Sequence, residues 1–313
     1  MAKRRHLTFG DDETYDSPKE LVQAYKEGLV GAYCDQAETE ALLAELPEPK
    51  FADAAPDLMG DGAGQVVALY PSYLKFDEGA FSEAQTTGSC VSHSCRNAID
   101  LTRAIEIDIK NEPESFVGRG ATEAIYGSRG HGGQGMSCAG AVRYVTSQGG
   151  VLLRGKYGNV DLTKLDDSLA ASWGRRGTPA EITAEAKKHQ VGTAAQITTV
   201  EEAKAALANG YAITTCGGEA WTATRDKNGI SEQRGSWSHA ITLGGFDDTG
   251  TLADETLWLL FNSWGKWNRG GMPPWANGKW PVGAWLSRNG PVVKRLRGGG
   301  SFAISNVDGW PLK

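Results

Sequence analysis

The chain has 313 residues, of which 32 are Lys or Arg and 38 are Asp or Glu, so its formal net charge is −6. This mild acidity is spread along the sequence and argues against a surface dedicated to nucleic acid or to an anionic membrane. The longest uninterrupted apolar runs, at 66–70 and 257–261, have five residues each, far short of the roughly 18 that a transmembrane helix needs. We therefore expect a folded, soluble chain with neither nucleic acid nor a membrane as a partner.

The amino terminus and the cysteines indicate a cytoplasmic location. The first residues are basic but lead into an acidic stretch at residues 11–13, without the apolar segment of a secretory signal peptide. An odd, widely spaced set of five cysteines is more typical of reduced thiols than of a disulfide framework. The five are Cys34, Cys90, Cys95, Cys138 and Cys216. We expect at least one to be free, and all except Cys90 to be structural thiols with apolar neighbours.

The amino-terminal part of the chain is predicted to be helical. Ser17, Pro18 and Glu20 form a capping pattern, and apolar residues follow at helical spacing. A helical hairpin over residues 17–46 is therefore expected. Prolines and glycines then end regular structure and mark a linker over residues 47–64.

The middle of the chain is predicted to be helical, and the later part to be rich in strands. Capping patterns and apolar spacing predict helices over residues 90–111, over 137–148, from Thr178 onward and over 199–210. Short apolar runs between turn residues predict strands over 211–216, 239–244 and 257–262.

Residues 88–90, Gly-Ser-Cys, place a thiol after a small-residue turn and at the start of a predicted helix. Unpaired backbone N–H groups and the positive end of a helix stabilise a thiolate relative to a thiol. Cys90 is therefore predicted to be a nucleophile. Such a nucleophile needs a proton-transfer partner, and the chain has five histidines.

His239 has the most favourable surroundings of the five histidines. It begins one predicted strand, and Asn262 ends the next one along the chain. If the two strands pair, the turn returns Asn262 to the side of His239, where the amide oxygen can fix the tautomer and rotation of the imidazole. Trp264 is then placed to shield that hydrogen bond from water. The sequence thus predicts a triad of Cys90, His239 and Asn262.

A zinc site is the alternative for the segment around the nucleophile. Cys90, His93 and Cys95 are close in sequence, but no second pair of ligands follows at the spacing of a metal site. We therefore expect neither a metal nor a cofactor.

Three segments resemble the papain-like cysteine peptidases: residues 88–90, residues 238–240 (Ser-His-Ala) and residues 262–265 (Asn-Ser-Trp-Gly). They occur in the order and contexts of that family's catalytic cysteine, histidine and asparagine. A glycine-rich segment followed by a predicted helix is similar to the family's glycine pair that offers backbone to an extended substrate. The resemblance implies this role for Gly132 and Gly133, and it spans roughly residues 61–290.

The resemblance implies an α+β papain-like fold, with the active-site cleft between a helical lobe and a β-barrel-like lobe. It also implies hydrolysis of peptide or related amide bonds in a peptide or protein substrate, with Gln85 and the Cys90 amide holding the oxyanion. The expected parts are an N-terminal helical extension and linker (1–60), a helical lobe with the nucleophile (61–195), a β-rich lobe with the histidine and asparagine (196–290), and a C-terminal tail (291–313).

The sequence departs from the family pattern around the nucleophile. Val91 stands where the family has a tryptophan, and Thr87 and Gly130 stand where it has a disulfide. Gln85 lies five residues before Cys90, whereas the family's glutamine lies six before, so the loop is one residue shorter. A misplaced oxyanion donor would remove roughly 2.7 to 4 kcal/mol of transition-state stabilisation.

Two other functions stay open at this stage. The shortened Gln85 loop, Val91 and the N-terminal extension are compatible with a weak or inactive fold that serves as a structural or interaction module. Its partners would then be further copies of itself or a larger protein complex, and its location a viral particle. A cell-wall amidase is the third possibility, and it would act on peptidoglycan fragments instead of protein.

Overall fold

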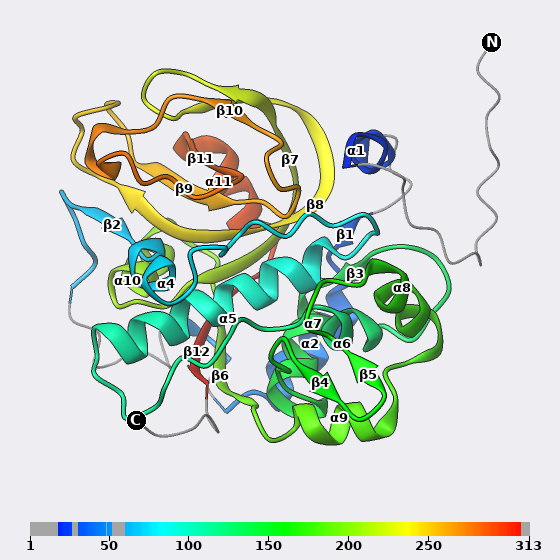
Figure 1. Cartoon of the computed structure of the whole chain (residues 1–313). Helices are drawn as coiled ribbons and strands as arrows, with labels where there is room; N and C mark the ends of the chain where they lie inside the picture. Colours follow the sequence, from blue (N-terminus) through cyan, green and yellow to red (C-terminus); the bar gives the residue numbers. More distant parts are fainter. Residues whose placement is uncertain (1–17, 27–30, 48, 52–59, 308–313) are drawn as a thin grey trace, which may run out of the picture.

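The computed structural model describes residues 18–26, 31–47, 49–51 and 60–307. A long central helix, α5 (Cys90–Asp108), separates a strand-rich lobe from a lobe of shorter helices (Figure 1). The expected α+β class with a helical lobe and a strand-rich lobe is confirmed.

The remaining helices are α1 (Pro18–Lys26), α2 (Gln36–Glu45), α4 (Tyr70–Phe76), α6 (Glu123–Gly127), α7 (Cys138–Arg143), its π-helical continuation η1 (Tyr144–Gln148), α8 (Asp167–Arg176), α9 (Ala180–Ala186), α10 (Val200–Ala208), the 3₁₀ turn η2 (Pro274–Ala276) and α11 (Asn289–Arg297). The strands are β1 (Ala32–Tyr33), β2 (Val66–Ala68), β3 (Met136–Ser137), β4 (Lys156–Tyr157), β5 (Val160–Asp161), β6 (Val191–Gln196), β7 (Ile213–Arg225), β8 (Ser231–Asp247), β9 (Leu257–Phe261), β10 (Arg269–Gly270), β11 (Ala284–Ser287) and β12 (Ser301–Val307).

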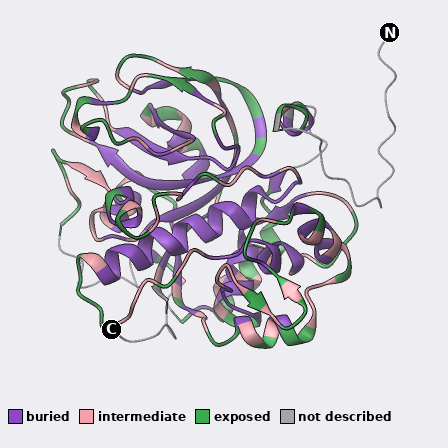
Figure 2. Cartoon of the chain, viewed as in Figure 1, coloured by how far each residue is buried: buried purple, intermediate pink, exposed green. Residues whose placement is uncertain are grey.

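Helix α5 forms the centre of the molecule. Every residue from Cys90 to Ile107 is buried, as the purple ribbon in Figure 2 shows. Two of its buried polar side chains bind elements on either side: Asp100 accepts a hydrogen bond of 2.8 Å from the Tyr73 hydroxyl, and Ser94 donates one of 2.6 Å to the carbonyl of Ile241. Because buried polar groups need partners, these contacts hold the helix in one position between the lobes.

The strand-rich lobe is built on an eight-stranded sheet. Six of its strands follow the order β11-β9-β8-β7-β12-β6, and the other two lie off this path, where β2 pairs with β8 and β10 pairs with β7. The antiparallel pairing of β8 with β9, which the predicted triad requires, is present. Residues 291–307, expected to be part of a tail, form most of α11 and all of β12. β12 pairs with both β6 and β7, and this pairing buries the apolar Phe302 and Ile304.

The amino-terminal segment is not one helical hairpin. α1 ends at Lys26, and α2 begins after Asp35, whose carboxylate accepts a hydrogen bond of 2.9 Å from the Glu38 N–H. Between them, β1 pairs in parallel with β3 of the helical lobe, so this stretch is extended because it joins another element. Ser17 and much of the predicted linker over 47–64 lie outside the described residues.

Of the capping patterns predicted at Thr178 and Thr199, only the one at Thr199 is formed. Thr199 Oγ1 accepts a hydrogen bond of 3.1 Å from the Glu202 N–H, and the Glu202 carboxylate accepts one of 3.0 Å from the Thr199 N–H. At the start of α9, Pro179 is the capping residue, and Thr178 Oγ1 donates to the Ala124 carbonyl at 3.0 Å. A tertiary contact therefore replaces the local cap that was predicted there.

The cysteines correct the prediction of a fully reduced set. Cys138 and Cys216 form a disulfide, with Cα atoms 6.0 Å apart, while Cys34, Cys90 and Cys95 are free. The interpretation of Cys138 and Cys216 as structural thiols is therefore wrong. The bond joins α7 to β7 across 78 positions, so no local pattern predicts it. The argument from reduced thiols for a cytoplasmic location loses its basis.

Within the described ranges, no helix is long and apolar enough to cross a membrane.

Replacing Cys138 and Cys216 together by Ala is expected to lower the free energy of unfolding by about 2–4 kcal/mol, because the bond restricts the unfolded chain. Denaturant unfolding without reductant measures the loss. Dithiothreitol should destabilise the wild type by a similar amount and leave the double variant unchanged. Cys95→Ala, which removes a buried free thiol, is the control for lost packing. A wild type equally stable with and without reductant would contradict the disulfide.

Candidate active site

His239 and Asn262 meet where β8 lies beside the end of β9. His239 Nε2 lies 2.8 Å from Asn262 Oδ1, and both side chains are buried. The N–H of Ser263 also lies 2.8 Å from Asn262 Oδ1. A backbone N–H can only donate, so this atom is the amide oxygen. His239 therefore donates through Nε2, and in its neutral form Nδ1 carries no proton.

The second ring nitrogen of His239 is left available. Nδ1 is buried and has no hydrogen-bond partner among the described residues. Burial lowers the pKa of His239 to about 3, although the hydrogen bond with Asn262 acts in the opposite direction. The imidazole is therefore neutral in this structure, with Nδ1 ready to accept a proton.

Trp264 covers the imidazole. Its ring stacks on that of His239, with centroids 4.3 Å apart and an interplanar angle of 28°. Trp264 is only 1% exposed. The indole therefore shields one face of the imidazole from water.

Cys90 is the first residue of α5 and is fully buried. Its sulfur accepts hydrogen bonds from the Tyr25 hydroxyl and from the backbone N–H groups of Val91 and Ala240. Because Ala240 follows His239 in β8, the thiol and the imidazole lie at the same seam between α5 and β8. Burial raises the pKa of the Cys90 thiol, and these hydrogen bonds oppose the rise.

Gln85 reaches this seam in spite of the shorter loop. Its backbone N–H donates to the Ser263 carbonyl at 2.9 Å, and its side-chain oxygen accepts from the Ser263 hydroxyl. Its Nε2 donates to the Thr87 carbonyl at 2.7 Å and to the Tyr25 hydroxyl at 3.0 Å. The Tyr25 oxygen thus contacts both Gln85 Nε2 and Cys90 Sγ.

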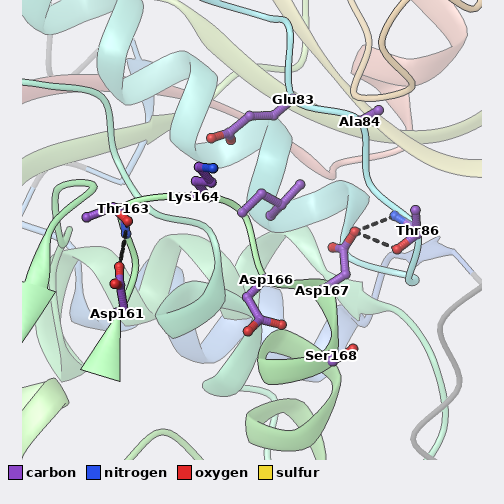
Figure 3. Close-up of a pocket in the computed structure, with 10 residues that line it drawn as sticks. Glu83, Ala84, Thr86, Asp161, Thr163, Lys164, Asp166, Asp167 and Ser168 are labelled. Carbon is purple, nitrogen blue, oxygen red and sulfur yellow. Dashed lines mark hydrogen bonds between the residues drawn. The ribbon is translucent and has the colours of Figure 1, made fainter. Parts of the chain in front are cut away.

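Asp167 holds the loop that carries Gln85. Its Oδ2 accepts hydrogen bonds of 2.6 Å from the Thr86 N–H and 2.7 Å from the Thr86 hydroxyl (Figure 3). It lies at the wall of a pocket of about 850 Å³ between residues 83–86 and the start of α8. Sequence analysis missed Asp167 because it lies 81 positions from Thr86, in a helix that was not predicted.

Tyr25 comes from α1, outside the three segments that carry the predicted triad. It is buried, its ring centroid lies 4.8 Å from that of His239, and it lies 5.4 Å from that of Trp264. Figure 1 shows α1 beside the long strand β8. The sequence marks Tyr25 only as one apolar position of a helix and therefore did not single it out.

The chain then crosses between the two lobes at residues 31–33. A β-carbon at Gly31 would lie 1.7 Å from the Ser238 carbonyl oxygen, and one at Gly135 would lie 1.8 Å from the Gly31 carbonyl oxygen. β1 then pairs in parallel with β3. The amino-terminal segment is thus in backbone contact with both lobes beside the candidate triad.

The predicted substrate-binding glycines lie next to this crossing. Gly132 is exposed, and no described atom lies within 4 Å of the point where its β-carbon would be. The backbone that flanks the amino-terminal segment belongs to Gly135 and β3, a few positions later. The role of Gly132 and Gly133 stays a prediction, because a run rich in glycine offers several registers that sequence alone does not distinguish.

His93 of α5 is buried, and burial lowers its pKa to about 3. In the part of the chain that the structure describes, no group of three or more His, Cys, Asp or Glu side chains is placed to hold a metal ion. The zinc alternative therefore gains no support from these residues.

No protein-family model and no curated protein matches the sequence, but solved structures do. Procathepsin B S9 from Trypanosoma congolense is 12% identical, with a TM-score of 0.53 over 91% of this chain and 88% of that chain. The ragweed pollen cysteine protease Amb a 11 in its proform is 15% identical, with a TM-score of 0.51 over 93% and 77%. Xylellain, a cysteine protease from Xylella fastidiosa, is 15% identical over 98% and 100%, with a TM-score of 0.49. The expected papain-like fold is confirmed.

The carboxyl of Asp167 makes stability depend on pH. Burial raises its pKa from 3.8 to about 6, so the folded state favours the neutral acid. The stability that the neutral Asp167 carboxyl contributes is complete below pH 3.8, the pKa in the unfolded chain, and is lost as the pH rises through 6, the pKa in the folded chain. Asp167→Asn keeps a neutral side chain of the same shape. Between pH 4 and pH 7, the wild type should lose about 2–3 kcal/mol relative to this variant. Denaturant unfolding at the two pH values measures the difference, and parallel changes in both proteins would contradict it.

Proposed function

We propose that this chain is a cysteine peptidase that hydrolyses peptide or related amide bonds through Cys90, His239 and Asn262. The observation that supports this best is the hydrogen bonding of His239. Nε2 donates to Asn262, while Nδ1 is buried without a partner at the seam that holds Cys90. A buried acceptor without a partner costs about 1–3 kcal/mol, and in this proposal the proton of the Cys90 thiol satisfies it.

In this proposal, His239 Nδ1 first takes the proton of the Cys90 thiol. The thiolate attacks the carbonyl carbon of the substrate, and Gln85 Nε2 together with the Cys90 N–H stabilises the oxyanion. His239 then protonates the leaving amine as the C–N bond breaks, which leaves a thioester on Cys90. Water, deprotonated by His239 Nδ1, hydrolyses the thioester to a carboxylic acid and restores the thiol.

Asn262 and Trp264 support the base in this scheme. The hydrogen bond to Asn262 keeps the proton of the neutral ring on Nε2, so that Nδ1 faces the reaction as the acceptor. Trp264 excludes water from the imidazole through its stacked ring. Asn262→Ala should therefore lower kcat more than it changes KM.

We further infer that the amino-terminal segment holds this peptidase in a closed state. The Tyr25 hydroxyl donates to the Cys90 sulfur and accepts from Gln85, which is the place a substrate carbonyl oxygen would take. Residues 31–33 lie between the lobes, with Gly31 against Ser238. A substrate must displace this segment before it reaches the thiol.

Tyr25→Ala is expected to open the site, because it removes both the buried ring and the hydroxyl. The rate of Cys90 alkylation by iodoacetamide and the rate of peptide hydrolysis should each rise roughly tenfold or more, since about 1.4 kcal/mol of lost closure energy corresponds to a factor of ten. Tyr25→Phe, which keeps the ring, should give a smaller rise. Lys19→Ala, at an exposed position of the same helix, is the control. Wild-type rates in Tyr25→Ala would contradict the closed state.

The oxyanion donor is tested in the Tyr25→Ala background. Gln85→Ala should lower kcat by about 10²–10³ with little change in KM, because the lost donor acts mainly in the transition state. Cys90→Ala should abolish hydrolysis, whereas Cys95→Ala, which removes another buried thiol of α5, should leave it intact. Steady-state kinetics on a peptide library measure these effects. An unchanged kcat in Gln85→Ala would exclude this role for Gln85.

The same assays separate the other functions. Hydrolysis of peptidoglycan fragments but not of denatured protein would support a cell-wall amidase. A chain that cleaves neither in the Tyr25→Ala background, and that is incorporated stoichiometrically into particles, would support a structural module.

A further inference from the structure

Arg295 is a buried arginine of α11 that has no part in the reaction described above. It is 1% exposed, and its guanidinium reaches into the bend where β7 and β8 change register. Nη1 donates to the His239 carbonyl at 2.9 Å and lies 3.4 Å from the Thr215 carbonyl, and Nη2 donates to the Glu219 carbonyl at 2.8 Å. Arg295 thus binds the backbone of the strand that carries the proposed base.

The charge of Arg295 is incompletely compensated. Glu219 Oε2 lies 3.5 Å from Nε, which is beyond the distance of a good charge-assisted hydrogen bond. The guanidinium otherwise meets carbonyl oxygens and the ring of Trp221, whose centroid lies 5.2 Å from Cζ. Burial lowers the pKa of Arg295 to about 10, so the group stays cationic at neutral pH. A positive charge in a poorly solvated interior acts over a longer range than one at the surface.

One peptide group connects this charge to the proposed nucleophile. The carbonyl oxygen of His239 accepts from Arg295 Nη1, and the N–H of the same peptide group, which belongs to Ala240, donates to Cys90 Sγ. A donor on the carbonyl oxygen draws electron density toward that oxygen and makes the N–H a stronger donor. The two hydrogen bonds therefore reinforce each other along the line from the guanidinium to the sulfur.

We propose that Arg295 is a positioning residue that stabilises the Cys90 thiolate through the peptide group between His239 and Ala240. The same contact fixes the backbone of His239 against β7. The role in catalysis rests on the proposed peptidase function, whereas the effect on the thiol does not. The positive charge of Arg295 favours the thiolate of Cys90 and disfavours a protonated His239. The thiolate therefore depends less on a neighbouring imidazolium for its stabilisation than it would without Arg295.

The groups around the sulfur determine how this is tested. The titratable or charged side chains that act on Cys90 are Tyr25 of α1, Tyr126 of α6 and Arg295 of α11, and His239 of β8 directly precedes Ala240, whose N–H donates to the sulfur. Burial raises the pKa of both tyrosines, so they stay neutral over about pH 5 to 9. With Tyr25 replaced, the pH dependence of alkylation in that range measures the deprotonation of the Cys90 thiol, on which His239 and Arg295 are then the main electrostatic influences.

The experiment measures the rate of Cys90 alkylation by iodoacetamide against pH in the full-length Tyr25→Ala chain. Arg295→Met should raise the midpoint by about one pH unit and slow alkylation below the midpoint about tenfold, with kcat reduced and KM little changed. Arg295→Lys, which keeps the charge, should retain most of the rate. Arg225→Met is the matched control, because Arg225 is a partly buried arginine of the same sheet that binds the Gly271 and Ala284 carbonyls.

An unchanged midpoint in a folded Arg295→Met chain would overturn the proposal and leave Arg295 a structural residue. If Arg295→Met does not fold, Arg295→Gln, an uncharged donor, is compared with Arg295→Lys, and equal midpoints in these two would overturn it as well. Alkylation reads the thiolate without a substrate. A shifted midpoint supports the proposal even if no variant cleaves peptides. An absence of cleavage in every variant would contradict the peptidase function but not the effect of Arg295 on the thiol.

Discussion

The contact between the start of α5 and strand β8 is the constraint on which the candidate site depends. Cys90 accepts from the Ala240 N–H, directly beside His239. Farther along α5, the Ser94 hydroxyl donates to the Ile241 carbonyl at 2.6 Å. These groups are buried, and an unpaired buried group costs about 1–3 kcal/mol. A shift of the helix along the strand would break both contacts, so the packing of the lobes holds the register that places Cys90 against Ala240, the residue after His239.

Two groups from outside the catalytic segments act on the same sulfur. Tyr25 donates a hydrogen bond to Cys90 but also seals it from water, and burial keeps the pKa of the thiol raised in this structure. In the proposed mechanism, departure of Tyr25 removes much of that burial, while the contacts from Ala240 and Arg295 remain. The event that admits a substrate would therefore also favour the thiolate, and a closed chain would keep its nucleophile protonated.

The triad candidates could be named from the sequence because each depends on local patterns. A small-residue turn before an amphipathic stretch places Cys90 at a helix start, and two apolar runs joined by a turn bring His239 and Asn262 together. Strands that follow each other along the chain and are joined by a short turn usually pair, and the turn then permits only a few registers. The glycine-rich segment at 130–135 was less informative, since the structure runs the amino-terminal segment along Gly135 and β3, not along Gly132.

The sequence by itself determined the fold class, the main strands and which side chains have the chemistry for a thiol hydrolase, because turns, caps and apolar periods act over a few residues. Only the tertiary structure decided that Tyr25 covers the thiol, that Asp167 holds the Gln85 loop and that Arg295 binds the His239 carbonyl. It also decided the disulfide between Cys138 and Cys216. The last three of these contacts, counting the disulfide, join residues that lie 56 to 81 positions apart in the chain. Tyr25 comes from a helix outside the catalytic segments. Such pairs leave no periodic trace, because their geometry exists only once the lobes have packed.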